Sequence, residues 1–130
     1  FYDCLLFFKH VIPEKGSSLI DVGTGAGFPG LALKIAYPNL HVTLLDSLNK
    51  RIQFLNEVIN QLGLKDIDTV HGRAEDFAKP GKLREKYDYI LIDAPPTLGG
   101  WVMNILCAAD KVVIPVEATP WGLFGLGNMF

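Results

Sequence analysis

The sequence predicts an α/β protein with a three-layer, Rossmann-like, doubly wound sheet of about five parallel strands and helices on both faces. Three observations lead to this class. Short runs rich in branched apolar residues alternate with segments of helical periodicity. A glycine-rich turn follows the first apolar run, and an aspartate ends the second. Such alternation is typical of a parallel sheet whose two faces are covered by helices.

Five apolar runs account for the expected strands. They are SLIDV (18–22), HVTLLD (41–46), IDTVHG (67–72), YDYILID (87–93) and KVVIPVE (111–117). Each run is short enough for a strand, and turn-forming residues separate most of them from the helical segments. Right-handed crossovers are expected between the parallel strands.

The intervening segments are predicted to be helical. Residues 29–37 begin with a proline suited to a first turn, and 98–109 place apolar residues on one face. The clearest helix is 48–62, where Leu and Ile recur at helical spacing; Ser47 is expected to cap its start and Gly63 to end it. Residues 73–86 are expected to hold one or two short helices, broken at a Pro-Gly pair.

Composition limits the classes of function. A chain of 130 residues with a formal net charge of −2 predicts one domain, 1–130, and not a protein that relies on phosphate contacts alone. Cys4 and Cys107 stand apart without a CxxC pattern, and the three histidines are scattered, so no metal site is expected. No apolar stretch is long enough for a membrane span, and the start of the chain is not a convincing signal peptide.

The turn DVGTGAGFPG carries the first functional signal. Gly23, Gly25 and Gly27 alternate, whereas a dinucleotide fingerprint would require glycine at the position of Phe28. Alternating glycines let the backbone pass close to a ligand that has no pyrophosphate. Asp46 ends the next strand, about 20 residues further on, where a carboxylate can accept both ribose hydroxyls. The pattern predicts an adenosine ligand; a tight turn followed by a helix-start aspartate is the structural alternative.

The leading two thirds of the chain resemble the bacterial small-subunit ribosomal RNA guanine-N7 methyltransferases (RsmG, also called GidB). The resemblance covers about residues 3–86, and the pieces that carry it are FYDCLL, which begins at residue 1, LIDVGTGAGFPGLALKIAYPNLHVTLLDSLNKRIQFLNEV and GRAEDF. The resemblance implies a Rossmann-like fold and S-adenosylmethionine as the cofactor. The cofactor-binding residues that it implies are Asp21, Gly23, Gly25 and Gly27 on the methionine and ribose side, Asp46 and Ser47 at the ribose, and Ala74 and Glu75 at the adenine.

The remaining residues, about 87–127, resemble a different family, the partition and division-site ATPases of the ParA/MinD type. LIDAPPTLGG, a helix ending Ala-Ala-Asp and VVIPV carry this resemblance. It implies that Asp93 would hold magnesium through water and that the loop 95–99, which includes Pro95 and Pro96, would sense the γ-phosphate. That chemistry needs a GxxxxGK[ST] loop, which the sequence lacks, so we interpret the motif as vestigial.

Two further readings of this turn fail at a necessary residue. The Asn/Asp-Pro-Pro-Tyr turn of amino-methyltransferases would need an aromatic residue at Thr97 and no intervening Ala94. The Asp-Ala-Pro-Cys turn of RNA cytosine methyltransferases would need a cysteine at Pro96. For Lys50 and Arg51, at the start of the second helix, a contact with RNA phosphate and an ordinary solvated helix face both stay open.

The two resemblances meet near Glu85–Asp88, so we interpret the chain as a chimera, engineered or recombined, with a methyltransferase-like half (1–86) and a ParA-like half (87–130). The expected function is a scaffold that retains most of an S-adenosylmethionine site with little or no turnover, and with RNA binding lost. The alternative is an active S-adenosylmethionine-dependent rRNA (guanine-N7) methyltransferase; an ATPase ranks last. Expected partners are S-adenosylmethionine or S-adenosylhomocysteine and a second copy of the chain, through the apolar segment 121–130.

Overall fold

A computed structural model describes residues 13–77, 87–94, 99–114, 119 and 127. The chain divides into two compact units, Phe1–Thr97 and Leu98–Phe130. The first unit contains all of the sheet and the predicted nucleoside site. The boundaries proposed from the sequence for the two halves stay a prediction.

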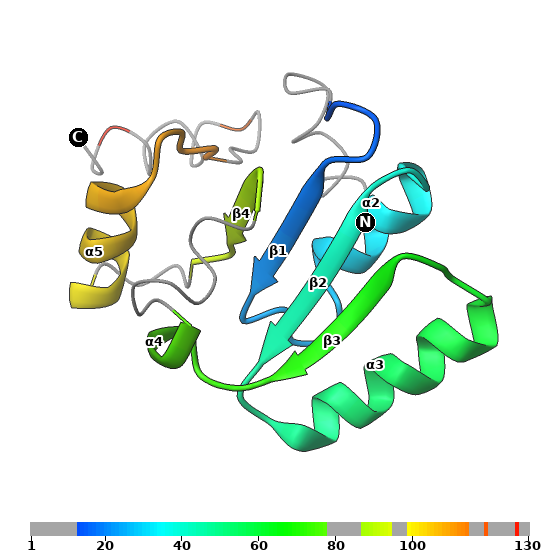
Figure 1. The fold of residues 1–130 in the computed structure, drawn as a ribbon. Coiled ribbons are helices and arrows are strands. Elements are labelled where there is room, and N and C mark those ends of the chain that lie inside the picture. Colours follow the sequence, from blue (N-terminus) through cyan, green and yellow to red (C-terminus); the bar gives the residue numbers. More distant parts are fainter. Residues whose placement is uncertain (1–12, 78–86, 95–98, 115–118, 120–126, 128–130) are drawn as a thin grey trace. The chain divides into compact units, whose positions relative to one another are not determined.

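The first unit is built on a sheet of four parallel strands in the order β3-β2-β1-β4 (Figure 1). The strands are β1 (Ser18–Val22), β2 (His41–Asp46), β3 (Ile67–His71) and β4 (Tyr89–Ile92). The predicted parallel α/β class and the first four predicted strands are therefore confirmed. All four strands begin at one edge of the sheet and end at the other, as a chain of βαβ units requires.

The fourth strand is held against the first by backbone pairing and by side-chain hydrogen bonds. In the ladder, Leu19 pairs with Tyr89 and Val22 with Ile92. Just before β4, the Asp88 Oδ2 accepts hydrogen bonds from the Ser18 backbone N–H (2.8 Å) and the Ser18 hydroxyl (2.9 Å). Those bonds lower the pKa of the Asp88 carboxyl. This strand is parallel, as expected, and it lies beside the first.

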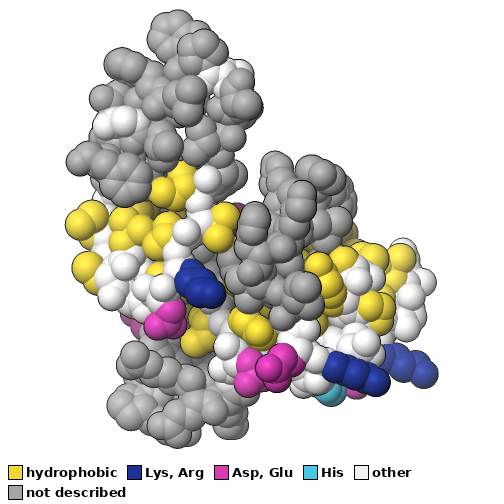
Figure 2. All heavy atoms as spheres, turned by 90° about the horizontal axis from the view of Figure 1, so that it is seen from above, with side chains coloured by type: hydrophobic (Ala, Val, Ile, Leu, Met, Phe, Trp, Pro, Cys, Tyr) yellow, Lys and Arg dark blue, Asp and Glu magenta, His cyan; other side chains and the backbone are white. Residues whose placement is uncertain are grey.

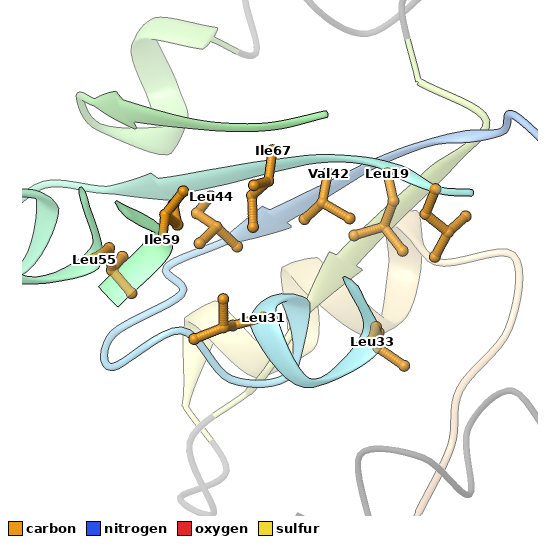
Figure 3. Packing of buried hydrophobic residues seen from close by; sticks show 9 residues of the cluster. Leu19, Leu31, Leu33, Val42, Leu44, Leu55, Ile59 and Ile67 are labelled. Carbon is orange, nitrogen blue, oxygen red and sulfur yellow. The ribbon is translucent and has the colours of Figure 1, made fainter. Parts of the chain in front are cut away.

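One face of the sheet is covered by α2 (Gly30–Ala36) and α3 (Asn49–Leu62). The strand side chains that point to this face pack against the apolar side chains of both helices, as Figure 3 shows for the labelled residues. The buried cluster consists of Leu19, Leu31, Leu33, Leu40, Val42, Leu44, Leu55, Ile59 and Ile67. Each of these side chains is at most 9% exposed, and burying an aliphatic side chain of this size contributes about 1.5–3 kcal/mol. Helices on the opposite face of the sheet stay a prediction.

The ends of α3 show one prediction confirmed and one wrong. Gly63 ends the helix in the left-handed conformation (φ 61°), with its N–H bonded to the Asn60 carbonyl. At the start of the helix, the N-cap residue is Leu48 and not Ser47, and the N-cap side chain makes no capping hydrogen bond. The Leu48 N–H is instead satisfied by the carboxylate of Asp46, at 2.8 Å. The carboxylate of the strand-ending aspartate, two residues before Leu48, therefore takes the place of the expected serine cap.

The second unit contains α5 (Gly100–Ala108), which confirms the predicted helix over 98–109. The predicted fifth strand is wrong for its described part: residues 111–114 have no strand partner, and Val112 and Val113 are 50% and 58% exposed. An apolar run becomes a strand only if a ladder receives it, and Pro115 within the run has no N–H to donate. Most of the apolar segment 121–130 lies outside the described residues, so the homodimer stays a prediction.

Gly30, the first residue of α2, packs tightly against the sheet. A Cβ at this position would lie 2.6 Å from the Leu44 Cδ2 and 2.8 Å from the Asp21 Oδ2. Gly30→Ala should therefore lower the free energy of unfolding by about 1–3 kcal/mol through overpacking, measured by urea denaturation.

Gly100→Ala is the matched control, because Gly100 also begins a helix but has nothing within 4 Å of the added methyl. It should leave the stability unchanged or raise it by up to about 1 kcal/mol. Equal losses in the two variants would contradict the tight packing of α2 on β1 and β2.

Candidate nucleoside site

The candidate site lies at the carboxyl edge of the sheet. There β1 runs into the glycine turn, β2 ends at Asp46, and β4 leads to Asp93 on the other side of β1. The chain crosses from one side of β1 to the other between β3 and β4, so the edge beside β1 is the switch point of the sheet. In open parallel sheets, ligands bind in the crevice outside the strand ends at such a point.

The glycine turn is folded over the end of β2. The backbone N–H groups of Gly23 and Thr24 both donate to the Leu45 carbonyl, at 2.9 and 3.0 Å. Gly23 and Gly25 have φ values of 78° and 61°, which side-chain-bearing residues rarely adopt. Nothing lies within 3.9 Å of a Cβ built on either. These two glycines therefore leave open space above the turn, where a ligand can approach the backbone.

Gly27 has a different role, although the sequence groups it with the other two. It is buried, with φ 99°, and a Cβ there would lie 2.9 Å from the Leu55 Cδ2 and 3.1 Å from the Leu31 Cβ. This glycine lets the turn pack between α2 and α3. It shapes the site from below and does not present a surface to a ligand.

Asp46 joins the turn to the helix that follows it. Its Oδ2 accepts from the Gly25 N–H at 2.9 Å and from the Arg51 Nη1 at 3.2 Å, and its Oδ1 accepts from the Leu48 N–H at 2.8 Å. The side chain is only 3% exposed. Burial alone would raise the pKa of this carboxyl, but the bonds from Leu48, Gly25 and Arg51 lower it below its ordinary value. The residue is thus an ionised acceptor at the predicted ribose position.

Asp21 lies beneath the turn and is fully buried. Its Oδ2 accepts from the Thr24 hydroxyl (2.7 Å) and the Gly30 N–H (2.8 Å), while its Oδ1 has no hydrogen-bond partner. Burial raises the pKa of the Asp21 carboxyl against the effect of these two bonds, and the nearby carboxylates of Asp93 and Asp46 raise it further. Asp21 therefore positions the turn and the start of α2 rather than lining the open space.

The predicted adenine side follows β3. His71, the last residue of β3, pairs in register with Asp46, and its Nε2 lies 3.0 Å from the Ser47 carbonyl oxygen. The helix α4 (Ala74–Phe77) begins three residues later, with Ala74 half-buried and Glu75 exposed. The Arg73 Nη1 donates to the Glu75 Oε1 at 3.3 Å, a weak pair of two largely exposed side chains. Ser47 is exposed beside Asp46.

Asp93 is exposed just beyond β4, while Pro95 and Pro96 lie outside the described residues. Among the described residues, no group of three or more His, Cys, Asp or Glu side chains could hold a metal ion. In the same part of the chain, no helix has the length and apolar character needed to cross a bilayer.

Two residues of the site were missed by sequence reasoning. Thr24 is 2% exposed, and its hydroxyl donates to Asp21; its place three residues after the aspartate of β1 is the signal that could have found it. Arg51 pairs with Asp46, whereas the sequence left an RNA contact and a solvated helix face as its alternatives. An arginine within the first helical turn after a strand-ending acid indicates such a pair.

Comparison with solved structures identifies the class of fold to which the sheet and the glycine turn belong. The chain is similar to a SAM dependent methyltransferase from Aquifex aeolicus, with a TM-score of 0.56 and 26% identity over 69% of this chain and 47% of that one. It is also similar in fold to coclaurine N-methyltransferase bound to N-methylheliamine and SAH, with a TM-score of 0.59 and 22% identity over 70% of this chain and 26% of that one. The fold is that of the Rossmann-like methyltransferases.

Sequence comparison makes the assignment more specific. Residues 1–98 match the family model for rRNA small subunit methyltransferase G (GidB), and the chain belongs to this family. Ribosomal RNA small subunit methyltransferase G of Lachnoclostridium phytofermentans is 57% identical over 91 residues, which is 70% of this chain and 38% of that protein. The protein of that name from Clostridium botulinum (strain Loch Maree) is 56% identical over 107 residues, 82% of this chain and 44% of that protein.

The chain thus spans about two fifths of the length of these relatives. A second model, for an AAA domain, matches residues 78–130, which is less than half of the chain. The two matches overlap over residues 78–98, and the methyltransferase match continues through β4 beyond the junction expected near Glu85–Asp88. The chimeric origin inferred from the sequence is a hypothesis that neither match requires.

Asp46 should make stability depend on pH at the acid end. Because the pKa of its carboxyl is lowered in the folded protein, the stabilisation is present above the ordinary value of 3.8 and is lost as the pH falls through the folded value. Asp46→Asn should remove most of this loss of stability at acid pH. It should also lower the free energy of unfolding at neutral pH by about 1–3 kcal/mol, because the amide NH₂ group would face the N–H of Gly25 or Leu48, which is also a donor.

Urea denaturation from neutral pH to about pH 2.5 measures both effects. Asp68→Asn, which removes an exposed carboxylate on β3, is the control for the effect of the same change of charge on stability. An acid-side loss of stability as steep in Asp46→Asn as in the wild-type protein would contradict the assigned role.

Proposed function

We propose that the first unit carries the S-adenosylmethionine site of an rRNA methyltransferase that acts on guanine N7 of small-subunit RNA. The observation that carries the proposal is the Asp46 carboxylate bonded to the Gly25 N–H, beside two glycines whose Cβ positions are open. Membership of the rRNA small subunit methyltransferase G family supports the reaction and the substrate class. The same membership supports a bacterial cytoplasmic location.

The residues present fit such a cofactor. Gly23 and Gly25 leave room for the ligand to lie against the turn, and the Asp46 carboxylate is placed to accept ribose hydroxyls. Ser47, Ala74 and Glu75 are assigned to the ribose and adenine sides by their place after β2 and β3. Asp21 and Gly27 hold the turn from below, through the bonds and contacts described above.

The bound cofactor would supply an electrophilic methyl group on a sulfonium sulfur. Guanine N7 has a free lone pair and no proton to lose, so the reaction needs no general base from the protein. The contribution of this chain is then to bind the nucleoside moiety and to fix its orientation, which in well-aligned reactions is worth about 7–11 kcal/mol of the barrier. The elements that would hold the RNA are not among the residues assigned here.

An active methyltransferase is better supported than the inert scaffold expected from the sequence. The inert scaffold rested on a break between two parent families before β4, but the methyltransferase match continues to residue 98. Figure 2 shows two basic side chains side by side at the lower right and another apart from them, with acidic side chains between.

An ATPase is the second candidate, favoured by the AAA domain match over residues 78–130. These 130 residues contain no GxxxxGK[ST] sequence, which is the element that holds the phosphates in that chemistry. Calorimetric titration with ATP and Mg²⁺ tests this candidate directly. Binding of ATP with an affinity equal to that of S-adenosylhomocysteine would reverse the ranking.

Gly25 and Gly63 offer a matched pair of variants for the cofactor site. Both have φ 61°, and neither has a heavy atom closer than 3.9 Å to an added Cβ. Gly25→Ala and Gly63→Ala should each cost about 1–2 kcal/mol of stability, since an L-residue is strained in this conformation. Only Gly25→Ala should weaken S-adenosylhomocysteine binding, by about tenfold or more, because its methyl group enters the ligand space.

Isothermal titration calorimetry below the unfolding transition of both variants gives the comparison. If the two variants bind S-adenosylhomocysteine equally well, the glycine turn is not the cofactor site.

Methyl transfer itself is measured with tritiated S-adenosylmethionine and small-subunit RNA that lacks the N7-methylguanine. We expect incorporation of label that depends on the protein and falls by at least about tenfold in Gly25→Ala, with Gly63→Ala close to wild type. Tight binding of S-adenosylhomocysteine without any incorporation would favour the binding scaffold over the enzyme.

A further inference from the structure

The partners of the Asp46 carboxylate leave little room for a ribose. A carboxylate has about four acceptor positions, two on each oxygen. Oδ2 already accepts two hydrogen bonds, from Gly25 and Arg51, and Oδ1 accepts one, from Leu48. One acceptor position is free, whereas the two hydroxyls of a ribose diol require two.

The three partners differ in how readily they can leave. The N–H groups of Gly25 and Leu48 belong to the backbone of the turn and of the α3 start, and their loss would disturb both. The Arg51 guanidinium is on a long side chain that is 51% exposed, and its bond of 3.2 Å is the longest of the three. Water can take over the hydrogen bonds of an exposed guanidinium at little cost.

We propose that Arg51 occupies the place of one ribose hydroxyl in the ligand-free protein and must move aside when a nucleoside with both hydroxyls binds. This inference rests on the proposed function, since it concerns the same site. Arg51 is then a residue that limits affinity and sets its dependence on the ribose hydroxyls. It also keeps the carboxylate of Asp46 paired while the site is empty, where an unpaired buried charge would be costly.

Arg51→Met tests this inference, because it removes the guanidinium and retains an aliphatic side chain. We expect S-adenosylhomocysteine to bind about two- to fivefold more tightly than to wild type, the range of an exposed ion pair that no longer has to be broken. High salt screens the Arg51–Asp46 pair, so the difference between the two proteins should shrink as ionic strength rises.

Lys50→Met is the matched control, since it removes the same charge from the neighbouring exposed residue of α3. It should leave the affinity near the wild-type value, which separates a specific exchange from a general effect of net charge. A second comparison uses adenosine, 2′-deoxyadenosine and 3′-deoxyadenosine as competitors of S-adenosylhomocysteine. At least one of the deoxynucleosides should gain less from Arg51→Met than adenosine does, because a single hydroxyl can use the free position.

The outcomes separate the inference from the function on which it rests. If Arg51→Met binds S-adenosylhomocysteine as weakly as wild type or more weakly, Arg51 is not a competitor and the inference is overturned while the site stands. If none of the folded variants binds S-adenosylhomocysteine, the proposed function fails and the inference fails with it. An equal gain in Lys50→Met and Arg51→Met would also overturn it, in favour of a general charge effect.

Discussion

The structure of the site depends on one buried carboxylate. Asp46 ends β2 and receives hydrogen bonds from the glycine turn after β1 and from the start of α3, so one side chain ties these two segments together. Because both donors are backbone N–H groups, the carboxylate fixes the course of the chain and not only a side-chain position. The bonds outweigh the cost of burial, as the lowered pKa of the carboxyl indicates.

A second carboxylate supports the first from below. Asp21 holds the Thr24 hydroxyl and the Gly30 N–H, and therefore sets where the turn ends and α2 begins. Gly30 permits this close approach, since any side chain there would meet Leu44 and Asp21. The two acidic residues have opposite pKa shifts. Burial dominates at Asp21 and raises the pKa of its carboxyl, which has two donors and leaves one oxygen without a partner, whereas at Asp46 the bonds from three donors outweigh burial and lower the pKa.

The pairing of β4 with β1 explains how one sheet accommodates matches to two family models. The ladder from Leu19–Tyr89 to Val22–Ile92 and the Asp88–Ser18 bonds need only a parallel strand that is preceded by an aspartate. The apolar run that follows, YILI, meets this need. The region where the two matches overlap includes this strand, so sequence similarity to a second family is compatible with a continuous sheet of the methyltransferase type.

Local patterns in the sequence determined the parallel α/β class, four strands, the helices α2, α3 and α5, and the glycine end of α3, because periodicity and turn residues act over a few neighbouring positions. They also located the glycine turn and Asp46. Only the tertiary structure decided that Gly27 packs while Gly23 and Gly25 stay open, and that Arg51 pairs with Asp46. It also decided that residues 111–114 form no strand. These outcomes depend on which groups meet in space, and neither hydrogen-bond partners 21 residues apart, such as Gly25 and Asp46, nor a ladder edge can be read from neighbouring residues.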